Sequence, residues 1–411
     1  MIRIVYNIFI NGYFLAIKLA SLIGNSKAKK FIAGRSFYNP KYFEGLLQVA
    51  RSKIIFHCAS AGEFEQALPL IKAYRKENPH DYILVSFFSP SGYELNKTCS
   101  LADDVIYLPI DTISKTKAFL KAVKPKKIFL SKYDIWPNLI LEAQSFECQC
   151  ILFSSTFRAN QIYFQWYGKF FKKVLESFSY IFVQTEADVM LLKSNGLKNK
   201  IVCAGDTRYD RVMSIAEEGE RIAQLDKASE QFSIIIAGST WPPDNFILAR
   251  SLTEALKLNP TMRLLVFPHL LDKASLNEAK TNFVKLKVNL IDHFDELDFV
   301  QYQVNIFSKP KFLSKAYASA SLAYIGGGFG AGIHNTLEAA VFQIPLVGGP
   351  KNKKFVEVQE LRRAGLFTEV NAVNSIIPLA DLIKNPQIKK AASYFFQDKG
   401  QAAKTILRQI K

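Results

Sequence analysis

Residues 326–338 read Gly-Gly-Gly-Phe-Gly-Ala-Gly-Ile-His-Asn-Thr-Leu-Glu, and they separate an apolar run at 321–325 from a second run at 337–342. The first run is typical of a buried strand and the second of a helix. Glycines in such a turn let backbone N–H groups approach an anion, and a helix start adds partial positive charge. The stretch therefore predicts an α/β fold with a phosphate-bearing ligand at this turn. A tight turn with capping residues and no ligand is the alternative.

Apolar runs typical of strands recur on both sides of a charged stretch at 211–231. Helical patterns, such as 64–76 and 187–194, lie between many of them. This alternation predicts parallel sheets covered by helices on both faces, and its restart predicts two such domains. Ligands of such sheets bind at the carboxyl ends of strands, so we expect the site in a cleft between the domains. The expected strands are 53–59, 82–89, 105–110, 127–130, 150–154, 180–184, 201–204, 233–237, 263–267, 288–291, 321–325 and 345–347.

The composition narrows the class of protein. The chain has 411 residues, of which 49% are apolar, and this is enough for two packed domains. A net charge of +17 implies an anionic partner, but no nucleic-acid-binding motif or Arg-rich tail is present, so we expect no nucleic acid. The cysteines are odd in number and form no C-x-x-C pair, which favours a reducing compartment over disulfides or a zinc site. They are Cys58, Cys99, Cys148, Cys150 and Cys203.

The N-terminal segment predicts an association with a membrane. Residues 1–53 contain nine Lys or Arg and one acid, and residues 4–17 are uncharged. Polar residues recur at helical spacing from Arg3 to Asn25 and form a narrow stripe on an otherwise apolar helix, which is suited to lying in or dipping into a bilayer. The basic flank up to Arg35 would meet anionic headgroups and keep the remaining chain cytoplasmic. A signal peptide and a buried core helix are the alternatives, and the pattern does not separate a spanning helix from an interfacial one.

Polar residues follow the expected strands of the first half. Glu63 ends the run His-Cys-Ala-Ser-Ala-Gly-Glu at 57–63, where Ser60 and Gly62 suit a strand-to-helix turn. A carboxylate there could take a proton from an attacking hydroxyl. A helix-start glutamate stabilised by the helix dipole is the alternative.

Two further strand ends carry charge. Asp134 lies in Lys-Tyr-Asp-Ile-Trp-Pro-Asn at 132–138 and could orient a base or a substrate, unless the segment only starts a helix. Arg208 follows the run at 201–204 and could neutralise a phosphate-bearing leaving group, or form an interdomain salt bridge. Arg158 begins a stretch of interleaved aromatic and basic residues, 158–173, which suits core packing or a grip on an anionic lipid.

The second half repeats the theme at three strand ends. Gly-Ser-Thr at 238–240 and Pro-His at 268–269 each follow an apolar run, and His334, Asn335 and Glu338 follow the glycine-rich turn. Each group could contact the phosphate, base or sugar of a donor. Each is weak evidence alone, since a single histidine is more often structural than functional.

Together and in this order, these motifs resemble those of the bacterial Kdo transferases. That family moves 3-deoxy-D-manno-oct-2-ulosonic acid (Kdo) from CMP-Kdo to lipid A precursor (lipid IVA). The resemblance covers nearly the whole chain, and its most specific parts are H-x-x-S-x-G-E at 57–63 and G-G-G…G-I-H-N-x-L-E-A ending at Ala339. Ile-Trp-Pro-Asn at 135–138 and Ala-Gly-Ser-Thr at 237–240 support it.

The resemblance implies a GT-B fold, in which two Rossmann-like domains face each other across a cleft. It implies a membrane-associated helix with its basic flank at 1–35, an acceptor-binding domain at 36–211 and a donor-binding domain at 212–411. The enzyme would invert the anomeric centre without a metal or other cofactor, at the cytoplasmic face of the inner membrane. Its partners would be CMP-Kdo, lipid A precursor and the anionic membrane surface.

The resemblance also implies roles for individual residues. Glu63 would be the general base, and Asp134 and Arg208 would support the transition state. The acceptor would contact Ser60, Gly62 and Arg158. The donor would contact Ser239, Thr240, Pro268, His269, Gly327, Gly328, His334, Asn335, Thr336, Leu337 and Glu338.

Two segments depart from the family pattern. Lys-Tyr-Asp at 132–134 stands where the family often has Glu-Thr-Glu, so the shorter Asp134 would place its carboxylate differently. Ser-Lys-Pro-Lys at 308–311 stands where a donor-contacting segment usually contains glycine, and no contact is assigned there. Another GT-B transferase of nucleotide sugars and a non-catalytic membrane-bound binding protein are the alternative functions. A nicotinamide dehydrogenase is disfavoured, because no acidic residue follows the glycine-rich turn at 345–350.

Overall fold

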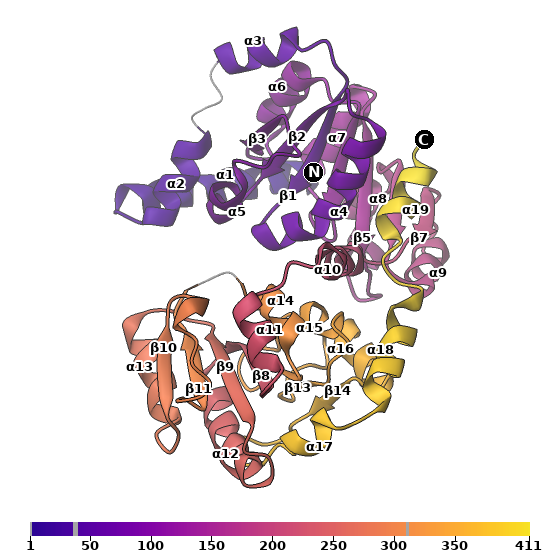
Figure 1. Ribbon diagram of the computed structural model, residues 1–411. Helices are drawn as coiled ribbons and strands as arrows, with labels where there is room; N and C mark the ends of the chain where they lie inside the picture. The colour runs from indigo at the N-terminus through magenta and orange to yellow at the C-terminus, as the bar shows by residue number, and fades with distance from the viewer. Residues whose placement is uncertain (1, 36–39, 310–311) are drawn as a thin grey trace. The chain divides into compact units, whose positions relative to one another are not determined.

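The computed structural model describes residues 2–35, 40–309 and 312–411. The chain forms two compact units, of which unit 1 extends to Arg211 and also contains Gly400–Lys411, while unit 2 is Val212–Lys399. Within the described residues each unit is built on one seven-stranded sheet, whose paired strands all run parallel (Figure 1). The expected α/β class with two Rossmann-like domains is confirmed.

Unit 1 has the strand order β3-β2-β1-β4-β5-β6-β7, so β1 and β4 are neighbours near the middle of the sheet. Its strands are β1 Lys53–Cys58, β2 Tyr82–Phe87, β3 Asp104–Tyr107, β4 Lys127–Ser131, β5 Gln149–Ser155, β6 Tyr180–Val183 and β7 Lys200–Cys203. The helices are α1 Ile2–Leu22, α2 Ser26–Arg35, α3 Pro40–Gln48, α4 Ala61–Glu77, α5 Pro90–Asn96, α6 Ile113–Val123, α7 Pro137–Ser145, η1 Ile162–Phe164, α8 Lys169–Glu176, α9 Glu186–Ser194, α10 Thr207–Glu218 (which crosses the boundary between the units) and α19 Ala402–Gln409.

The strands of unit 1 are apolar at nearly every position because both faces of the sheet are covered. Successive side chains point to opposite faces, so Ile55 packs in one hydrophobic cluster while Ile54 and Phe56 pack in another. The Phe56 and Phe129 rings stack at 4.5 Å between centroids across the β1–β4 pair. The buried sheet fixes the places at which the strand ends emerge, and these ends carry the candidate site.

Unit 2 has the strand order β10-β11-β9-β8-β12-β13-β14. Its strands are β8 Ser233–Thr240, β9 Met262–Pro268, β10 Val288–Ile291, β11 Val304–Phe307, β12 Leu322–Ile325, β13 Leu346–Gly348 and β14 Phe367–Glu369. The helices are α11 Ala223–Ser229, α12 Pro242–Leu258, α13 Lys273–Asn282, η2 Phe294–Glu296, α14 Leu313–Ala316, η3 Tyr317–Ser319, α15 Leu337–Ala340, α16 Val356–Arg363, α17 Leu379–Ile383 and α18 Gln387–Gln397. Each of the twelve expected strands is present, and β11 and β14 were not expected.

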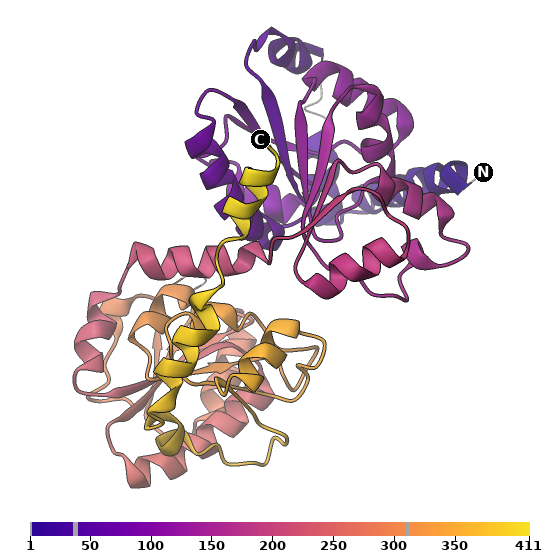
Figure 2. The same ribbon diagram turned by 90° about the vertical axis from the view of Figure 1, so that its right-hand side faces the viewer.

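The C-terminal segment differs from the expected domain limits. The sequence assigned 212–411 to the second domain, whereas Gly400–Lys411 belongs to unit 1. Figure 2 shows the C-terminal helix beside the sheet of unit 1, where Ile406 and Leu407 join a hydrophobic cluster with residues of α4. The Asp210 carboxylate accepts the N–H groups of Ala402 and Ala403 at the start of α19, and burial raises its pKa to about 6. A short C-terminal helix alone gives no sequence signal for the domain on which it packs.

Candidate functional site

The turn from β1 to α4 holds Glu63 at the carboxyl end of a central strand. Ser60 is the N-cap residue of α4, and its Oγ accepts the backbone N–H of Glu63 at 3.4 Å. The same hydroxyl donates to Glu63 Oε2 at 2.8 Å. Ser60, expected to contact the acceptor, is therefore bonded to Glu63. Glu63 is partly exposed and Gly62 is exposed beside it, so the carboxylate can be reached from solvent.

His57 lies fully buried at the end of β1, where its ring meets three side chains. Nδ1 is 2.9 Å from Ser86 Oγ, and Nε2 is 3.0 Å from both Asp134 Oδ2 and the indole Nε1 of Trp136. One nitrogen cannot accept the indole proton and donate to a carboxylate at the same time. When Nε2 accepts from Trp136, Asp134 Oδ2 is a buried carboxylate oxygen without a hydrogen-bond donor among the described residues. A substrate group that donates a proton would satisfy it.

The two predicted carboxylates lie near one buried thiol. Burial raises the pKa of Cys58 well above its ordinary value, and the charges of Asp134 and Glu63 raise it further. Cys58 is therefore an inert thiol here. Glu63 and Asp134 follow the carboxyl ends of β1 and β4, which are neighbouring strands. The structure thus brings together the two carboxylates that the sequence proposed.

Arg208 lies in the first turn of α10, shortly after β7, and is paired locally. Its guanidinium bonds Asp206 Oδ2 at 2.7 and 2.8 Å, and its backbone N–H donates to Asp206 Oδ1 at 2.9 Å. Gln66, one turn after Glu63 in α4, donates to the same Asp206 Oδ1 at 2.8 Å. Arg208 is therefore tied to the helix that carries Glu63, and a phosphate that approached it would compete with Asp206.

Arg158 follows β5 at the same edge of the sheet. Its side chain is exposed, and its backbone N–H donates to Gln161 Oε1 at 3.0 Å. Trp166 and Tyr167, in the aromatic stretch that Arg158 begins, are 85% and 53% exposed. Part of this stretch is thus a surface and not a core.

The glycine-rich turn of unit 2 differs from the expected anion site. The helix that follows it, α15, has four residues, so its partial positive charge is smaller than the sequence suggested. The Gly327 N–H already donates to the carboxylate of Asp244 at 2.9 Å, and the Gly326 N–H donates to the Gly238 carbonyl at 2.9 Å. A carboxylate of the protein, and not a ligand, holds this part of the turn.

Asp244 is a buried residue of this turn that the sequence reasoning missed. It is 1% exposed, and it accepts the Tyr324 hydroxyl at 2.7 Å and the backbone N–H groups of Trp241 and Gly327 at 2.9 Å each. Burial raises the pKa of Asp244, while these three donors act in the opposite direction. The available signal was its place at the third position of α12, directly after Ala-Gly-Ser-Thr at 237–240, where a carboxylate caps a helix start.

Three rings stack where β8, β9 and β12 end. Trp241 and His269 have centroids 4.6 Å apart, and His269 and His334 have centroids 4.7 Å apart. The indole N–H of Trp241 donates to His334 Nε2 at 3.3 Å. Burial lowers the pKa of His334, and the neighbouring His269 lowers it further. The neutral form of His334 is therefore favoured, and the expected donor residues His269 and His334 are in contact.

Other expected donor residues surround this stack. The hydroxyls of Thr240 and Thr336 are buried and have no hydrogen-bond partner among the described residues. Asn335 Nδ2 donates to Glu338 Oε1 at 2.7 Å. Leu337 is fully buried, so its side chain belongs to the core and not to a ligand site.

The remaining predicted positions are structural or undescribed. Ser239 has a left-handed φ of 52° at the end of β8, and Pro268 ends β9 opposite Thr240. Gly328 is buried against Gly349. In the atypical segment 308–311, Ser308 bonds Asp292, whereas positions 310 and 311 lie outside the described residues.

Gly328→Ala is expected to destabilise unit 2. An added Cβ would lie 2.5 Å from the nitrogen and 2.6 Å from the Cα of Gly349, so backbone would have to move. Forced overpacking of this kind costs about 1–3 kcal/mol. The urea midpoint of the full chain measures the change. Gly330→Ala is the matched control, because its Cβ would meet no atom closer than 3.6 Å. Equal midpoints for the two variants would contradict the close approach.

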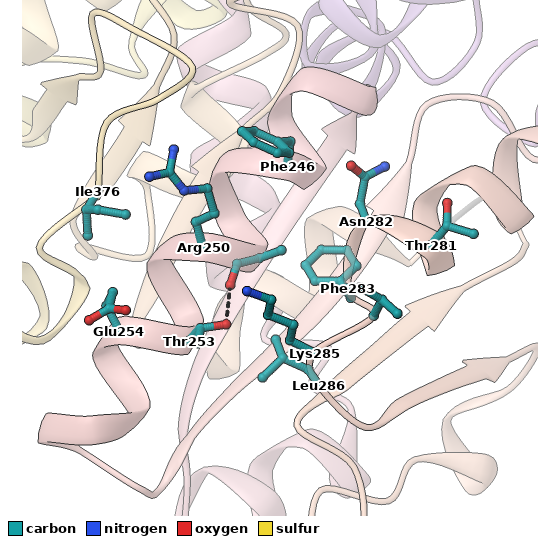
Figure 3. A pocket seen from close by; sticks show the side chains of 12 residues that line it. Phe246, Arg250, Thr253, Glu254, Thr281, Asn282, Phe283, Lys285, Leu286 and Ile376 are labelled. Carbon is teal, nitrogen blue, oxygen red and sulfur yellow. Dashed lines mark hydrogen bonds between the residues drawn. The ribbon is translucent and has the colours of Figure 1, made fainter.

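A separate pocket of about 740 Å³ lies on the outer side of α12 (Figure 3). Phe246, Arg250 and Glu254 line it from α12, and Thr281–Leu286 lines it from the end of α13 and the loop toward β10. This loop enters β10 at its amino end, whereas the predicted donor residues follow the carboxyl ends of strands. The pocket is therefore not the predicted donor site.

The two Rossmann-like units, with polar residues at the carboxyl ends of their strands, define a GT-B type of fold. A solved UDP-GlcNAc 2-epimerase from Neisseria meningitidis, bound to UDP-GlcNAc, has this fold. It superposes with a TM-score of 0.63 and 18% identity over 87% of this chain and 99% of that chain. At this identity the likeness concerns the fold alone.

Sequence similarity then relates the chain to a family. Residues 32–211 match the family described as 3-deoxy-D-manno-octulosonic-acid transferase (kdotransferase). A 3-deoxy-D-manno-octulosonic acid transferase from Aquifex aeolicus is 27% identical over 342 residues, which are 82% of this chain and 88% of the relative. One from Rickettsia felis is 25% identical over 315 residues, which are 75% of this chain and 66% of the relative. The resemblance to Kdo transferases drawn from the motifs is confirmed.

Proposed function

We propose that this protein transfers Kdo from CMP-Kdo to the lipid A precursor lipid IVA, with inversion at the anomeric carbon. The observation that carries the proposal is Glu63, whose carboxylate is oriented by the Ser60 hydroxyl at the end of β1. This turn, Asp134 and Arg208 all lie within the segment that matches the Kdo transferase family.

In the proposed reaction, Glu63 accepts the proton of a hydroxyl of the acceptor sugar. The oxygen of that hydroxyl forms a bond to C2 of Kdo while the bond between C2 and the phosphate oxygen breaks, and CMP leaves with the bonding electron pair. Attack from the face opposite the leaving group inverts C2. Glu63 later releases its proton to water. A positioned general base of this kind contributes about 10²–10⁴-fold to a rate.

Asp134 has a supporting role in this proposal. Its Oδ2 is buried beside His57 and lacks a donor within the described part of the chain, so it suits a hydroxyl of Kdo or of the acceptor. His57, bonded to Ser86 on the opposite side of its ring, would hold Asp134 in place as a positioning residue. Arg208 would meet the developing negative charge of the phosphate once its bond to Asp206 is shared.

The donor would bind unit 2 at the carboxyl ends of β8, β9 and β12. The stacked rings of Trp241, His269 and His334 offer an aromatic surface for a cytosine base. The unpartnered hydroxyls of Thr240 and Thr336 offer hydrogen bonds to polar groups of CMP-Kdo. We expect transfer to need no metal, so the rate in excess EDTA should equal that in its absence. In the described parts of the chain, no three His, Cys, Asp or Glu side chains are arranged to hold a metal ion.

The test is incubation of the purified full-length protein with CMP-Kdo and tetra-acylated lipid A precursor, followed by mass spectrometry of the lipid. We expect lipid products heavier by one or more Kdo units. UDP-sugars serve as competing donors in parallel reactions. Transfer from a UDP-sugar and not from CMP-Kdo would show another nucleotide-sugar transferase. Binding of CMP-Kdo without any product would show a non-catalytic binding protein.

A further inference from the structure

The first part of the polar stripe of α1 docks the helix onto the rest of unit 1. The Arg3 guanidinium donates to Asn138 Oδ1 at 2.9 Å and pairs with Glu142, both in α7. Asn7 Oδ1 accepts the Asn138 side-chain N–H at 3.2 Å and the Ile113 backbone N–H at 3.4 Å. These partly buried polar side chains therefore face the rest of unit 1.

Tyr6 adds a buried contact to the same docking surface. Its hydroxyl donates to Asp111 Oδ2 at 2.7 Å. Asp111 is 2% exposed, and it also accepts the backbone N–H groups of Asn138 and Leu139 at 3.0 and 2.8 Å. Tyr6 thus completes a carboxylate site at the start of α7, and its removal would leave that carboxylate one donor short.

The contacts continue along the helix. Ile10 is buried with Phe31 of α2 and Ile110, and Phe14 and Ile17 pack against this cluster. The contacts of α1 with the rest of unit 1 therefore extend from its second residue, Arg3, to Ile17. Figure 2 shows α1 lying along unit 1, toward the end marked N.

The opposite face of α1 is apolar and exposed. Its large side chains there are 43–81% exposed, and an adjoining Ile23 is 87% exposed. By length and composition α1 is the helix, among the described residues, that could cross a membrane. Its exposed apolar residues are Ile2, Ile4, Val5, Ile8, Phe9, Tyr13, Leu15, Leu19 and Leu22.

Cations border this apolar face. Lys18, Lys27, Lys29 and Lys30 are exposed around the end of α1 and the start of α2. The Lys115 ammonium lies 4.3 Å from the centroid of the Phe14 ring, and burial and the nearby Lys18 lower its pKa. An apolar face bordered by lysines complements a bilayer with anionic headgroups, and a second copy of this equally basic chain would be repelled.

We propose that α1 lies in the plane of the membrane, with its apolar face among the acyl chains, and does not span it. The inference rests on the proposed function only for the presence of the membrane. A spanning α1 would have to leave Asp111, Asn138 and Glu142, or carry these polar groups and unit 1 into the hydrocarbon, and both are costly. When α1 lies in the plane of the membrane, it keeps its contacts with the rest of unit 1, and its apolar face contacts the acyl chains.

The first test is the sidedness of the N-terminus. A protease-cleavable tag placed before Met1 of the full chain is examined in sealed inverted inner-membrane vesicles. An in-plane helix leaves the tag on the outer surface of these vesicles, so added protease removes it without detergent. Protection of the tag until detergent is added would overturn the inference. This readout needs no Kdo transfer, so it stands or falls separately from the proposed activity.

The second test measures binding to vesicles of phosphatidylglycerol and phosphatidylethanolamine by co-sedimentation. The double variant Ile8→Glu, Leu15→Glu is expected to bind about tenfold or more weakly than wild type, because each change removes an apolar contact and adds like charge to an anionic surface. Leu258→Glu, Val284→Glu is the matched control, at sites of unit 2 that are 77% and 81% exposed. Unchanged binding of the α1 variant, or a vesicle-independent dimer that this variant dissociates, would overturn the inference. Equal melting temperatures establish that the variants are folded.

Discussion

Glu63→Gln is expected to lower the rate of Kdo transfer by about 10²–10⁴-fold, because an amide cannot accept the proton of the attacking hydroxyl. The substitution keeps the shape of the side chain, and its carbonyl oxygen can still accept the hydrogen bond from Ser60. Stability and donor affinity should therefore remain close to wild type. The loss should appear in kcat and not in the affinity for CMP.

The measurement is single-turnover transfer to lipid A precursor at saturating CMP-Kdo. Glu65→Gln is the matched control, since Glu65 lies two positions along the same helix, is exposed and pairs with Arg211. It should transfer at the wild-type rate. Ser60→Ala, which frees the carboxylate without removing it, should fall between the two. A Glu63→Gln variant within threefold of wild type would show that another group is the base.

Asp244→Ala should produce the second large effect, on both unit 2 stability and donor binding. It would leave the Tyr324 hydroxyl and the N–H groups of Trp241 and Gly327 without their acceptor at a site that is 1% exposed. Each buried donor left unpaired costs about 1–3 kcal/mol, so a total of about 3 kcal/mol or more is expected. The glycine-rich turn and the Trp241 ring would lose a shared support.

Urea unfolding of the full chain and calorimetric titration with CMP report the two effects. CMP affinity should fall by at least about 100-fold, which corresponds to about 2.7 kcal/mol. Asp272→Asn is the control in the same unit, because Asp272 caps the exposed start of α13 and such a cap contributes only about 1 kcal/mol. If a folded Asp244→Ala variant binds CMP with wild-type affinity, Asp244 does not support the donor site.

Most strands were predictable because parallel sheets covered on both faces read as unbroken apolar runs. The two exceptions differ. β11, Val304–Phe307, has the same pattern of one Asn among apolar residues as the predicted β10, Val288–Ile291, so its signal was present but overlooked. In β14, Phe367–Glu369, three residues with a single large apolar side chain carry too little pattern.

Helix length was less predictable than helix presence. The run at 337–342 suggested a helix strong enough to bind an anion, but α15 ends at Ala340. Gln343 adopts a left-handed φ of 59° shortly before Pro345, and the residue preceding a proline disfavours helical geometry. The turn is present, but its Gly327 N–H donates to Asp244, and its Gly326 N–H donates to a backbone carbonyl.

The sequence predicted which residues at the strand ends belong to the candidate site. It did not predict the contacts that these regions make with residues far away in the chain. Glu63 and Ser60 are three residues apart, so a local motif contained their interaction. Asp244 meets Tyr324 and Gly327 across 80 and 83 residues, and no local pattern encodes such a contact. Likewise the polar stripe of α1 was visible, but its partners Asp111 and Asn138 lie more than 100 residues away. The sequence therefore revealed an amphipathic helix without showing that Arg3 and Asn7 on its polar side are bonded to α7.

The short segment from Trp136 to Asn138 serves two distant parts of unit 1. Trp136 bonds His57 beside Asp134, while Asn138 bonds Arg3 and Asn7 of α1. Because one segment contacts both the surroundings of Asp134 and α1, binding at Asp134 and docking of α1 are linked, and such linkage is reciprocal. Under the proposed function, acceptor binding at Asp134 and the docking of α1 would therefore favour each other through this segment. The lipid composition of the membrane would then change the rate of sugar transfer.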